Sequence, residues 1–229
     1  MKAILCVLAA AVTLCSPAFS AAADLSALSN QDAALGMRDA LTQGAGKAVE
    51  LLGRPGGFLD NAKVKIPLPD NLRRIESGLR LMGMKQQADE LVVTMNRAAE
   101  SAVPEAKALL VDAVKNMSVQ DAKGILTGGD TAATEYFRRA TSAQLTQRFL
   151  PIVTEATNKV GLANQNNGLV ERGAQLGLVG KDERIENYVT RKSLDGLYLV
   201  IGEQERAIRQ NPVGAATGAA RKVFEMLGR

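Results

Sequence analysis

Apolar residues recur every three or four positions through the middle of the chain, and this spacing constrains the fold more than any other feature. The pattern is regular from Ala88 to Ala102, and it resumes after Pro104 between Ala106 and Met117. Such spacing places the apolar side chains on one face of an α-helix. Proline suits the first turn of a helix and not its interior. We therefore predict two successive amphipathic helices in this region.

Two further apolar stripes predict helices nearer the N-terminus. One runs from Ala34 to Leu52 and is followed by Gly53, which predicts the end of the helix. A shorter one runs from Leu72 to Leu79, with Asp70 as its cap. Pairs of residues typical of a capping box mark three helix starts: Ser29 with Asp32, Ser118 with Asp121, and Thr141 with Gln144.

The segment "DGLYLVIGEQERAIRQ" contains five consecutive apolar residues, from Leu197 to Ile201. This run suits either a buried strand or the middle of a central helix. The apolar pattern extends from Ile185 to Ile208, and this length favours a helix. A helix that is apolar all round at its centre is surrounded by others. Gly196 and Gly202 are expected to allow close helix approach.

The remaining segments complete an all-α prediction with one compact multi-helix domain over residues 24–229. The stretch "AKVKIPLPDNL" alternates apolar residues with lysines, but two prolines limit it, and we predict a packed loop there. The last residues, 215–229, are predicted to form a packing helix, with a membrane or partner surface as the alternative. No fixed-period repeat and no linker divides the chain.

The first residues have the layout of a secretory signal peptide. Lys2 precedes an apolar run from Ala3 to Leu14, and small residues follow. The run is too short to span a bilayer. We predict that residues 1–23 are removed, with cleavage between Ser20 and Ala23, and that the protein is periplasmic. The alternative is a lipid anchor on Cys15, which the large Leu14 before it disfavours.

Composition excludes several function classes. The chain has no histidine, and both cysteines lie in the predicted signal peptide, so the usual metal ligands and Ser-His or Cys-His catalysis are missing. We expect no cofactor and no metal. After signal removal the chain has 27 basic and 24 acidic residues, and no long run of like charges. Aromatic residues make up 3% of the sequence. Both features argue against nucleic acid as a partner. No transmembrane span is predicted in the mature chain.

The stretch "KGILTGGDTAATEYFRR" places two glycines and an acid between apolar segments. It lacks the spacing of phosphate-binding loops, GxxxxGK[ST] or GxGxxG. It fits a helix that ends at Gly128 or Gly129, followed by Asp130 or Thr131 as the cap of the next helix. The alternative is an anion site in which Gly129, Thr131 and Thr134 expose amides or hydroxyls at a cleft.

Charge for such an anion site would come from Arg138 or Arg139. We favour a different role, in which Glu135, three and four residues earlier, pairs with these arginines on a solvated face. The apolar side of the same helix would carry Tyr136 and Phe137.

Polar residues on the shoulders of two predicted helices are further candidates. Asn96 and Glu100 lie one turn apart, whereas Arg97 points largely away. A half-buried carboxylate there can act as an acid or base, but hydrogen bonding to a neighbouring helix is the favoured role. Asp195 and Tyr198, three residues apart, have the same two interpretations.

Three stretches carry a resemblance to a known family: "VTMNRAAESAVPEAKALLVDAVKNMSVQDAKGILTGGDTAATEYFRRATSAQL", "KIPLP" and "SLDGLYLVIGEQERAIRQNP". They resemble a bacterial family catalogued as domain of unknown function 4197, over nearly the whole mature chain. The resemblance implies an exported helical protein, periplasmic in a Gram-negative bacterium. It supplies no activity, ligand or catalytic residue.

Two functions follow from these observations. The preferred one is a non-enzymatic binding or scaffold protein of the bacterial envelope. A binding protein would hold an apolar or amphiphilic ligand, or an envelope protein partner, between its helices; its oligomeric state is not predicted. The alternative is a hydrolase or lyase without histidine or metal, with acid-base residues assisted by Tyr136 or an arginine. Its carboxylates would be drawn from Glu100, Asp121, Asp130 and Asp195.

Overall fold

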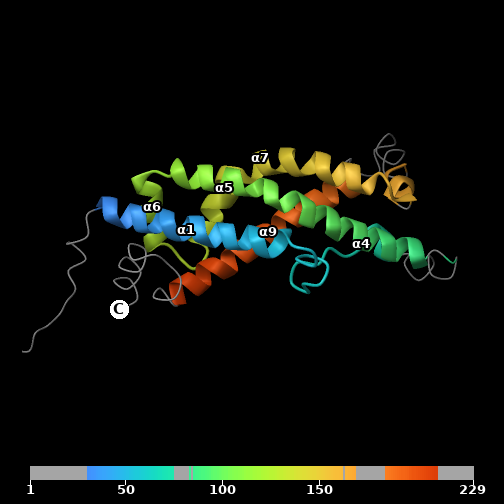
Figure 1. Cartoon of the computed structure of the whole chain (residues 1–229), viewed down its shortest axis with the longest axis horizontal. Coiled ribbons are helices and arrows are strands. Elements are labelled where there is room, and N and C mark those ends of the chain that lie inside the picture. The colour runs from blue at the N-terminus through green and yellow to red at the C-terminus, as the bar shows by residue number, and fades with distance from the viewer. Residues whose placement is uncertain (1–29, 75–82, 84, 162, 169–183, 211–229) are drawn as a thin grey trace, which may run out of the picture.

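The computed structural model describes residues 30–74, 83, 85–161, 163–168 and 184–210. This part of the chain is all-helical and contains no β-strand, as predicted (Figure 1). Its elements, in chain order, are α1 (Asn30–Gly53), α2 (Asp70–Arg74), α4 (Lys85–Ala102), the 3-10 turn η2 (Val103–Glu105), α5 (Ala106–Lys115), α6 (Val119–Thr127), α7 (Ala132–Thr157) and α9 (Ile185–Gln210).

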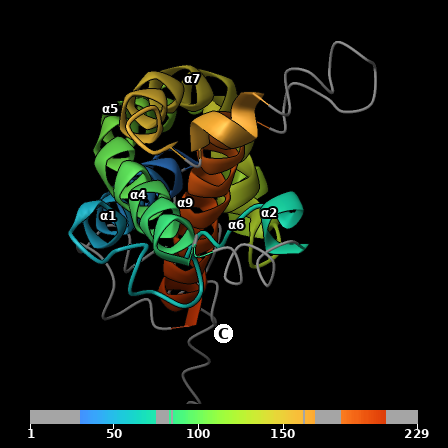
Figure 2. The same cartoon turned by 90° about the vertical axis from the view of Figure 1, so that its right-hand side faces the viewer.

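Helix α9 lies at the centre of the helical bundle. It packs against α1, α4 and α7, and the end-on view shows these helices grouped around it (Figure 2). The run from Leu197 to Ile201 is helical, and four of its five residues are buried. Leu199 is the exception, with 42% of its surface exposed. The prediction of a central helix is therefore confirmed.

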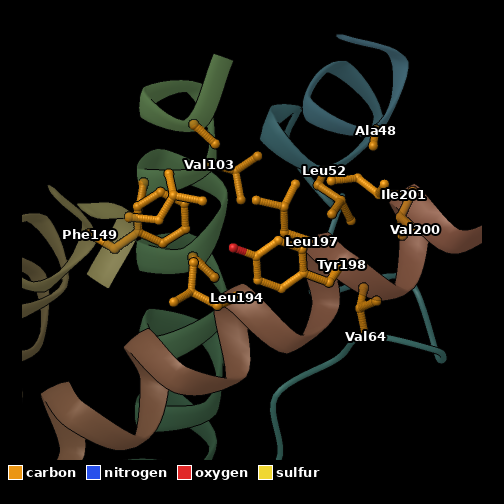
Figure 3. Packing of buried hydrophobic residues seen from close by; sticks show 14 of the residues in the cluster. Ala48, Leu52, Val64, Val103, Phe149, Leu194, Leu197, Tyr198, Val200 and Ile201 are labelled. Carbon is orange, nitrogen blue, oxygen red and sulfur yellow. The ribbon is translucent and has the colours of Figure 1, made fainter. Parts of the chain in front are cut away.

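The core is built from the apolar stripes of the long helices. Leu197 and Ile201 of α9 lie opposite Ala48 and Leu52 of α1, with Val103 of η2 beside them (Figure 3). The predicted stripe of α4 is buried almost throughout, because every third or fourth residue faces the other helices. Burial of these side chains is the main favourable contribution to folding.

Two glycines of α9 allow close approach, but to different kinds of neighbour. A Cβ added at Gly202 would lie 3.3 Å from Thr134 Oγ1 on α7, so this glycine faces a helix as predicted. A Cβ added at Gly196 would lie only 2.7 Å from Phe58 Cε1. Phe58 belongs to the loop after α1, so Gly196 admits a loop side chain and not a helix.

Helix α7 is longer than the sequence pattern indicates. Thr141 was expected to begin a helix with Gln144, but it lies inside α7 and is 2% exposed. Its hydroxyl reaches the Phe137 carbonyl oxygen at 2.7 Å and the Tyr198 hydroxyl at 2.9 Å. A threonine that bonds back to the preceding turn needs no capping position. The helix also continues through Pro151.

The segment between α1 and α2 is a packed loop, as predicted. Val64, Ile66 and Leu68 are buried, and no residue of the segment is in a strand. Helix α1 ends at Gly53 as expected. Ser118 and Asp121 form the predicted capping box at the start of α6.

Several predictions fall outside the described residues. These are the signal peptide over 1–23, Ser29 of the first capping pair, the continuation of the second helix beyond Arg74, and the helix over 215–229. Helix α2 begins at Asp70. Among the helices that are described, none combines the length and apolar character needed to cross a bilayer.

Candidate functional site

Asn96 on α4 holds the loop after α1 through two hydrogen bonds between its side-chain amide and the backbone of Ile66. Its Oδ1 accepts a hydrogen bond from the Ile66 amide at 2.8 Å, and its Nδ2 donates to the Ile66 carbonyl oxygen at 2.9 Å. Both residues are buried. Asn96 therefore satisfies backbone groups that would otherwise be buried without partners.

Glu100, one turn further along α4, holds the other end of the same loop. Its Oε1 accepts hydrogen bonds from the amides of Phe58 and Leu59, at 3.1 and 3.0 Å, and its Oε2 lies 2.6 Å from Arg97 Nη1. Burial alone would raise the pKa of Glu100, but the hydrogen bonds from Leu59, Arg97 and Phe58 outweigh it and lower the pKa. The carboxylate is thus held in its charged form.

The predicted polar network around Asn96 and Glu100 is present, but its partner differs from the expected one. Both side chains bond the loop and not a neighbouring helix. Arg97, expected to point away, pairs with Glu100 although 46% of its side chain is exposed. The contacts of Asn96 and Glu100 with Ile66, Phe58 and Leu59 attach the loop to α4.

The first turn of α7 is capped from a distant helix. Glu205 of α9 accepts hydrogen bonds from the amides of Ala133 and Thr134, each at 2.9 Å, and from the Thr134 hydroxyl at 2.8 Å. Thr131 occupies the N-cap position, as expected, but its side chain makes no capping hydrogen bond. The prediction that Asp130 or Thr131 caps this helix through its side chain is therefore wrong.

Arg209 completes this arrangement. Its guanidinium contacts Glu205 Oε1 at 2.8 Å and donates to the Ile125 carbonyl oxygen near the end of α6 at 2.9 Å. One carboxylate and one guanidinium of α9 thus hold the helices on both sides of the "TGGDT" turn. Helix α6 ends at Thr127 with Gly128 as its C-cap, as predicted. Gly129, Asp130 and Thr131 are exposed at the turn.

Glu186 is a third buried carboxylate with a structural role. Its Oε2 accepts a hydrogen bond from Asn167 Nδ2 at 2.7 Å, and Asn167 Oδ1 accepts from the Ile185 amide at 2.8 Å. Sequence reasoning did not single out Glu186 or Glu205. A carboxylate on the buried face of a predicted amphipathic helix was the signal available for both.

Three of the candidate site residues predicted from the sequence line one small pocket between α6 and α7. Asp121, Tyr136 and Arg139 surround a volume of about 260 Å³. The Tyr136 hydroxyl donates to the Ala113 carbonyl oxygen at 2.7 Å, and burial raises the pKa of Tyr136. Hydrogen bonds from the Ser118 hydroxyl and amide lower the pKa of Asp121. The acid and the phenol both already have structural partners.

Arg138 and Asp195 lie in a different pocket, between α7 and α9. One guanidinium nitrogen of Arg138 lies 3.7 Å from Asp195 Oδ1, and both side chains are about half exposed. The guanidinium also stacks over the Tyr198 ring, 4.6 Å from its centre. The expected pairing of Arg138 with Glu135 is not found among the described residues, because Arg138 turns toward α9.

A wide hollow runs along α1 and was not predicted. It has a volume of about 1190 Å³ and lies between α1, the turn at η2, the start of α5 and the end of α9. Val49, Pro104 and Ile208 contribute apolar surface. Three cationic side chains line it, Lys47, Arg54 and Lys107, together with the single acid Glu50. None of these cations forms an ion pair or hydrogen bond with another described residue.

The described residues contain no group of three or more histidine, cysteine, aspartate or glutamate side chains that could hold a metal ion. The fold and these pockets define an all-helical domain with polar clefts between its helices. The family model described as "Protein of unknown function (DUF4197)" matches residues 27–225, and the chain belongs to this family. Comparison with curated proteins and with solved structures found no match.

Proposed function

We propose that this chain is a non-enzymatic binding protein of the bacterial envelope, and that the groove along α1 holds an extended acidic segment of a partner protein. The observation that carries the proposal is a set of three cations, Lys47, Arg54 and Lys107, beside apolar surface in the hollow along α1. None of the three has an ion-pair or hydrogen-bond partner for its side chain among the residues that the structure describes. Cations that have no structural partner are available to a ligand, and complementary charge gives both specificity and a faster association.

The spacing of the cations favours an extended peptide. Lys47 and Arg54 are separated by two turns of α1, which corresponds to about 10 Å along the helix axis. An extended chain covers about 3.3 Å per residue and so spans this distance in about three residues. Lys107 stands on the other wall of the groove. Acidic residues repeated every second or third position would meet these charges, with apolar residues between them over Val49 and Ile208.

The placement of the carboxylates supports a binding role over acid-base catalysis. Glu100 is buried against the loop, with backbone amides as partners. Asp121 and Asp195 line different pockets, and Asp130 is exposed at the turn. A glycosidase-like pair needs two carboxyl groups about 5 to 10 Å apart across one cleft. The candidate acids are instead distributed over separate elements.

Fluorescence anisotropy with a labelled acidic peptide tests the proposal. The peptide carries aspartate or glutamate at every third position and leucine or valine between, and a second peptide has glutamine in place of each acid. We expect the acidic peptide to bind, and its affinity to fall with added salt because the contact is ionic. Changing Lys47, Arg54 and Lys107 together to Gln should lower the affinity at least about tenfold, since a tenfold loss needs only about 1.4 kcal/mol.

A matched triple variant controls for net charge. Lys85, Lys115 and Lys159 are exposed and do not line the groove, and each is paired with an acid three or four residues away. Changing these three to Gln should leave peptide binding intact. Equal binding of the acidic and glutamine peptides, or equal losses in the two triple variants, would contradict the proposal. Binding of an anionic amphiphile in place of the peptide would also contradict it.

The envelope location is tested separately. The intact mass of the native chain recovered from the periplasmic fraction should correspond to a protein that begins close to Asp24. Recovery of the full-length mass from the cytoplasm would contradict the location without touching the groove, and a lipid-modified Cys15 would show as added mass in the membrane fraction.

A further inference from the structure

The pocket between α7 and α9 contains polar groups that the fold does not use. It has a volume of about 340 Å³, with Leu150 and Leu194 on its apolar side. Ligand pockets begin at about this size, so the space suits a small molecule. It is lined by different residues from the groove along α1 and does not depend on the function proposed for that groove.

Arg138 is fixed in this pocket by an aromatic ring and not by hydrogen bonds. Its guanidinium stacks on the buried Tyr198 ring, and the Tyr198 hydroxyl is in turn held by Thr141 at 2.9 Å. Stacking leaves the N–H groups in the guanidinium plane free to donate, and a fixed arginine fork matches a carboxylate with two parallel hydrogen bonds. No hydrogen bond joins this guanidinium to the residues that the structure describes.

The acid beside Arg138 restricts what can bind there. Asp195 Oδ1 is 3.7 Å from the guanidinium, which is longer than a hydrogen bond. A half-exposed pair of this kind contributes at most about 1 kcal/mol, so a ligand can displace it at little cost. A simple anion on Arg138 would be repelled by Asp195. A ligand that also carries a cation would satisfy both groups.

Thr190 is a further polar residue at this pocket. Its side chain lines the pocket and is 2% exposed, yet its hydroxyl oxygen has no hydrogen-bond partner among the described residues. A buried hydroxyl without a partner costs about 1 to 3 kcal/mol. Arg191 also lines the pocket, but its guanidinium lies over the Tyr188 ring, 5.9 Å from the ring centre.

From this geometry we infer that the α7–α9 pocket binds a free α-amino acid as its zwitterion. The carboxylate meets Arg138, and the ammonium group meets Asp195. Arg138 and Asp195 are neighbours, so the two ligand charges must also be neighbours, as they are on a single α-carbon. The side chain of the amino acid lies over Leu150 and Leu194, which favours an apolar one.

The test is calorimetric titration of the full chain with L-leucine, L-leucinamide and 4-methylpentanoate. The last two lack the carboxylate and the ammonium group, respectively, and keep the same side chain. We expect L-leucine to bind and each analogue to bind at least about tenfold more weakly, a loss of about 1.4 kcal/mol or more. The other L-amino acids are then compared by thermal shift, since a ligand that binds only the folded state raises its stability.

Three variants assign the contacts. Arg138→Lys keeps the charge but loses the planar fork, and should weaken L-leucine binding about tenfold; Arg148→Lys, on an exposed part of the same helix, is the control and should not. Asp195→Asn should weaken the binding of L-leucine and reduce the difference in affinity between L-leucine and 4-methylpentanoate. Thr190→Val should leave the free protein as stable or more stable, because the buried unpartnered hydroxyl is removed.

Absence of binding by all the L-amino acids at about 10 mM, where even affinities of a few kcal/mol are detected, would overturn the inference. So would binding of 4-methylpentanoate as tight as that of L-leucine, since Asp195 would then have no role in recognition. Failure of the acidic peptide in the groove would leave this result unaffected.

Discussion

Glu205 of α9 caps the first turn of α7 through Thr134, although 71 residues separate Glu205 from Thr134 in the chain. One carboxylate oxygen of Glu205 receives both the amide and the hydroxyl of Thr134, at 2.9 and 2.8 Å. The start of α7 is therefore fixed by the central helix and not by its own neighbours in sequence. The glycine-rich turn before it is set in place from outside, which explains why no residue of the turn needs to cap the helix.

Replacement of Glu205 should be among the most damaging single changes in the chain. Glu205→Ala removes the acceptor for two amides and a hydroxyl and leaves Arg209 partly buried without its partner, so we expect a loss of about 3 kcal/mol or more in the free energy of unfolding. Urea denaturation measures it. Glu203→Gln, two residues earlier and in an exposed ion pair with Lys63, is the control, and its effect should stay within about 1 kcal/mol. Similar losses in both variants would contradict the assigned role.

Asn96 should control the attachment of the loop between α1 and α2. Asn96→Ala leaves both the amide and the carbonyl of Ile66 buried without a partner, at a cost of about 2 to 4 kcal/mol. Hydrogen exchange should report a large loss of protection at the Ile66 amide, because opening of the loop becomes easier. Gln87 is exposed on the same helix, and Gln87→Ala should change neither the stability nor the exchange of the Ile66 amide. Unaltered exchange at Ile66 would show that the loop is held by packing alone.

Glu100 should contribute stability that depends on pH in the acid range. Its pKa in the folded protein lies below its ordinary value of 4.5, so its contribution is fully present above that value and is lost as the pH falls through the folded pKa. Stability curves for the native chain and for Glu100→Gln should differ by a constant amount from neutral pH down to about 5 and converge below it. A gap that widens in acid would mean that the pKa is raised.

Two glycine-to-alanine changes should act in opposite directions. The Cβ of Gly196→Ala would meet Phe58 and Val64 at 2.7 and 3.2 Å, and overpacking of this kind costs about 1 to 3 kcal/mol. The Cβ of Gly124→Ala in α6 meets nothing within 4 Å, so the variant should gain about 0.5 to 1 kcal/mol from helix propensity. Thermal unfolding of both proteins measures the contrast. Equal shifts of the same sign would exclude packing as the reason for Gly196.

Local patterns predicted the helices because the information lies within a few residues of each position. The stripes of α1, α4 and α9 follow the helical period, Gly53 ends α1, and Ser118 with Asp121 begins α6. The family was also predicted from sequence alone. These features require no knowledge of what lies across the core.

Contacts between distant segments could not be predicted in the same way. Threonine is a typical capping residue, but the Thr141 hydroxyl forms hydrogen bonds with Tyr198 of another helix and with the Phe137 carbonyl oxygen of its own helix. Asn96 and Glu100 were expected to bond a helix, and they bond a loop whose path is set by its own buried side chains. The groove along α1 combines residues from four separate elements, none of which is distinctive by itself.

The central position of α9 has a consequence for how the chain is made. The helix that fills the middle of the bundle is the last of the described helices to leave the ribosome, so the faces of α1, α4 and α7 that it covers stay bare until residues 185–210 have been synthesised. A nascent chain that ends before Ile185 cannot complete its core and exposes apolar surface that chaperones recognise. Premature termination should therefore yield material that is degraded, and not a smaller folded protein.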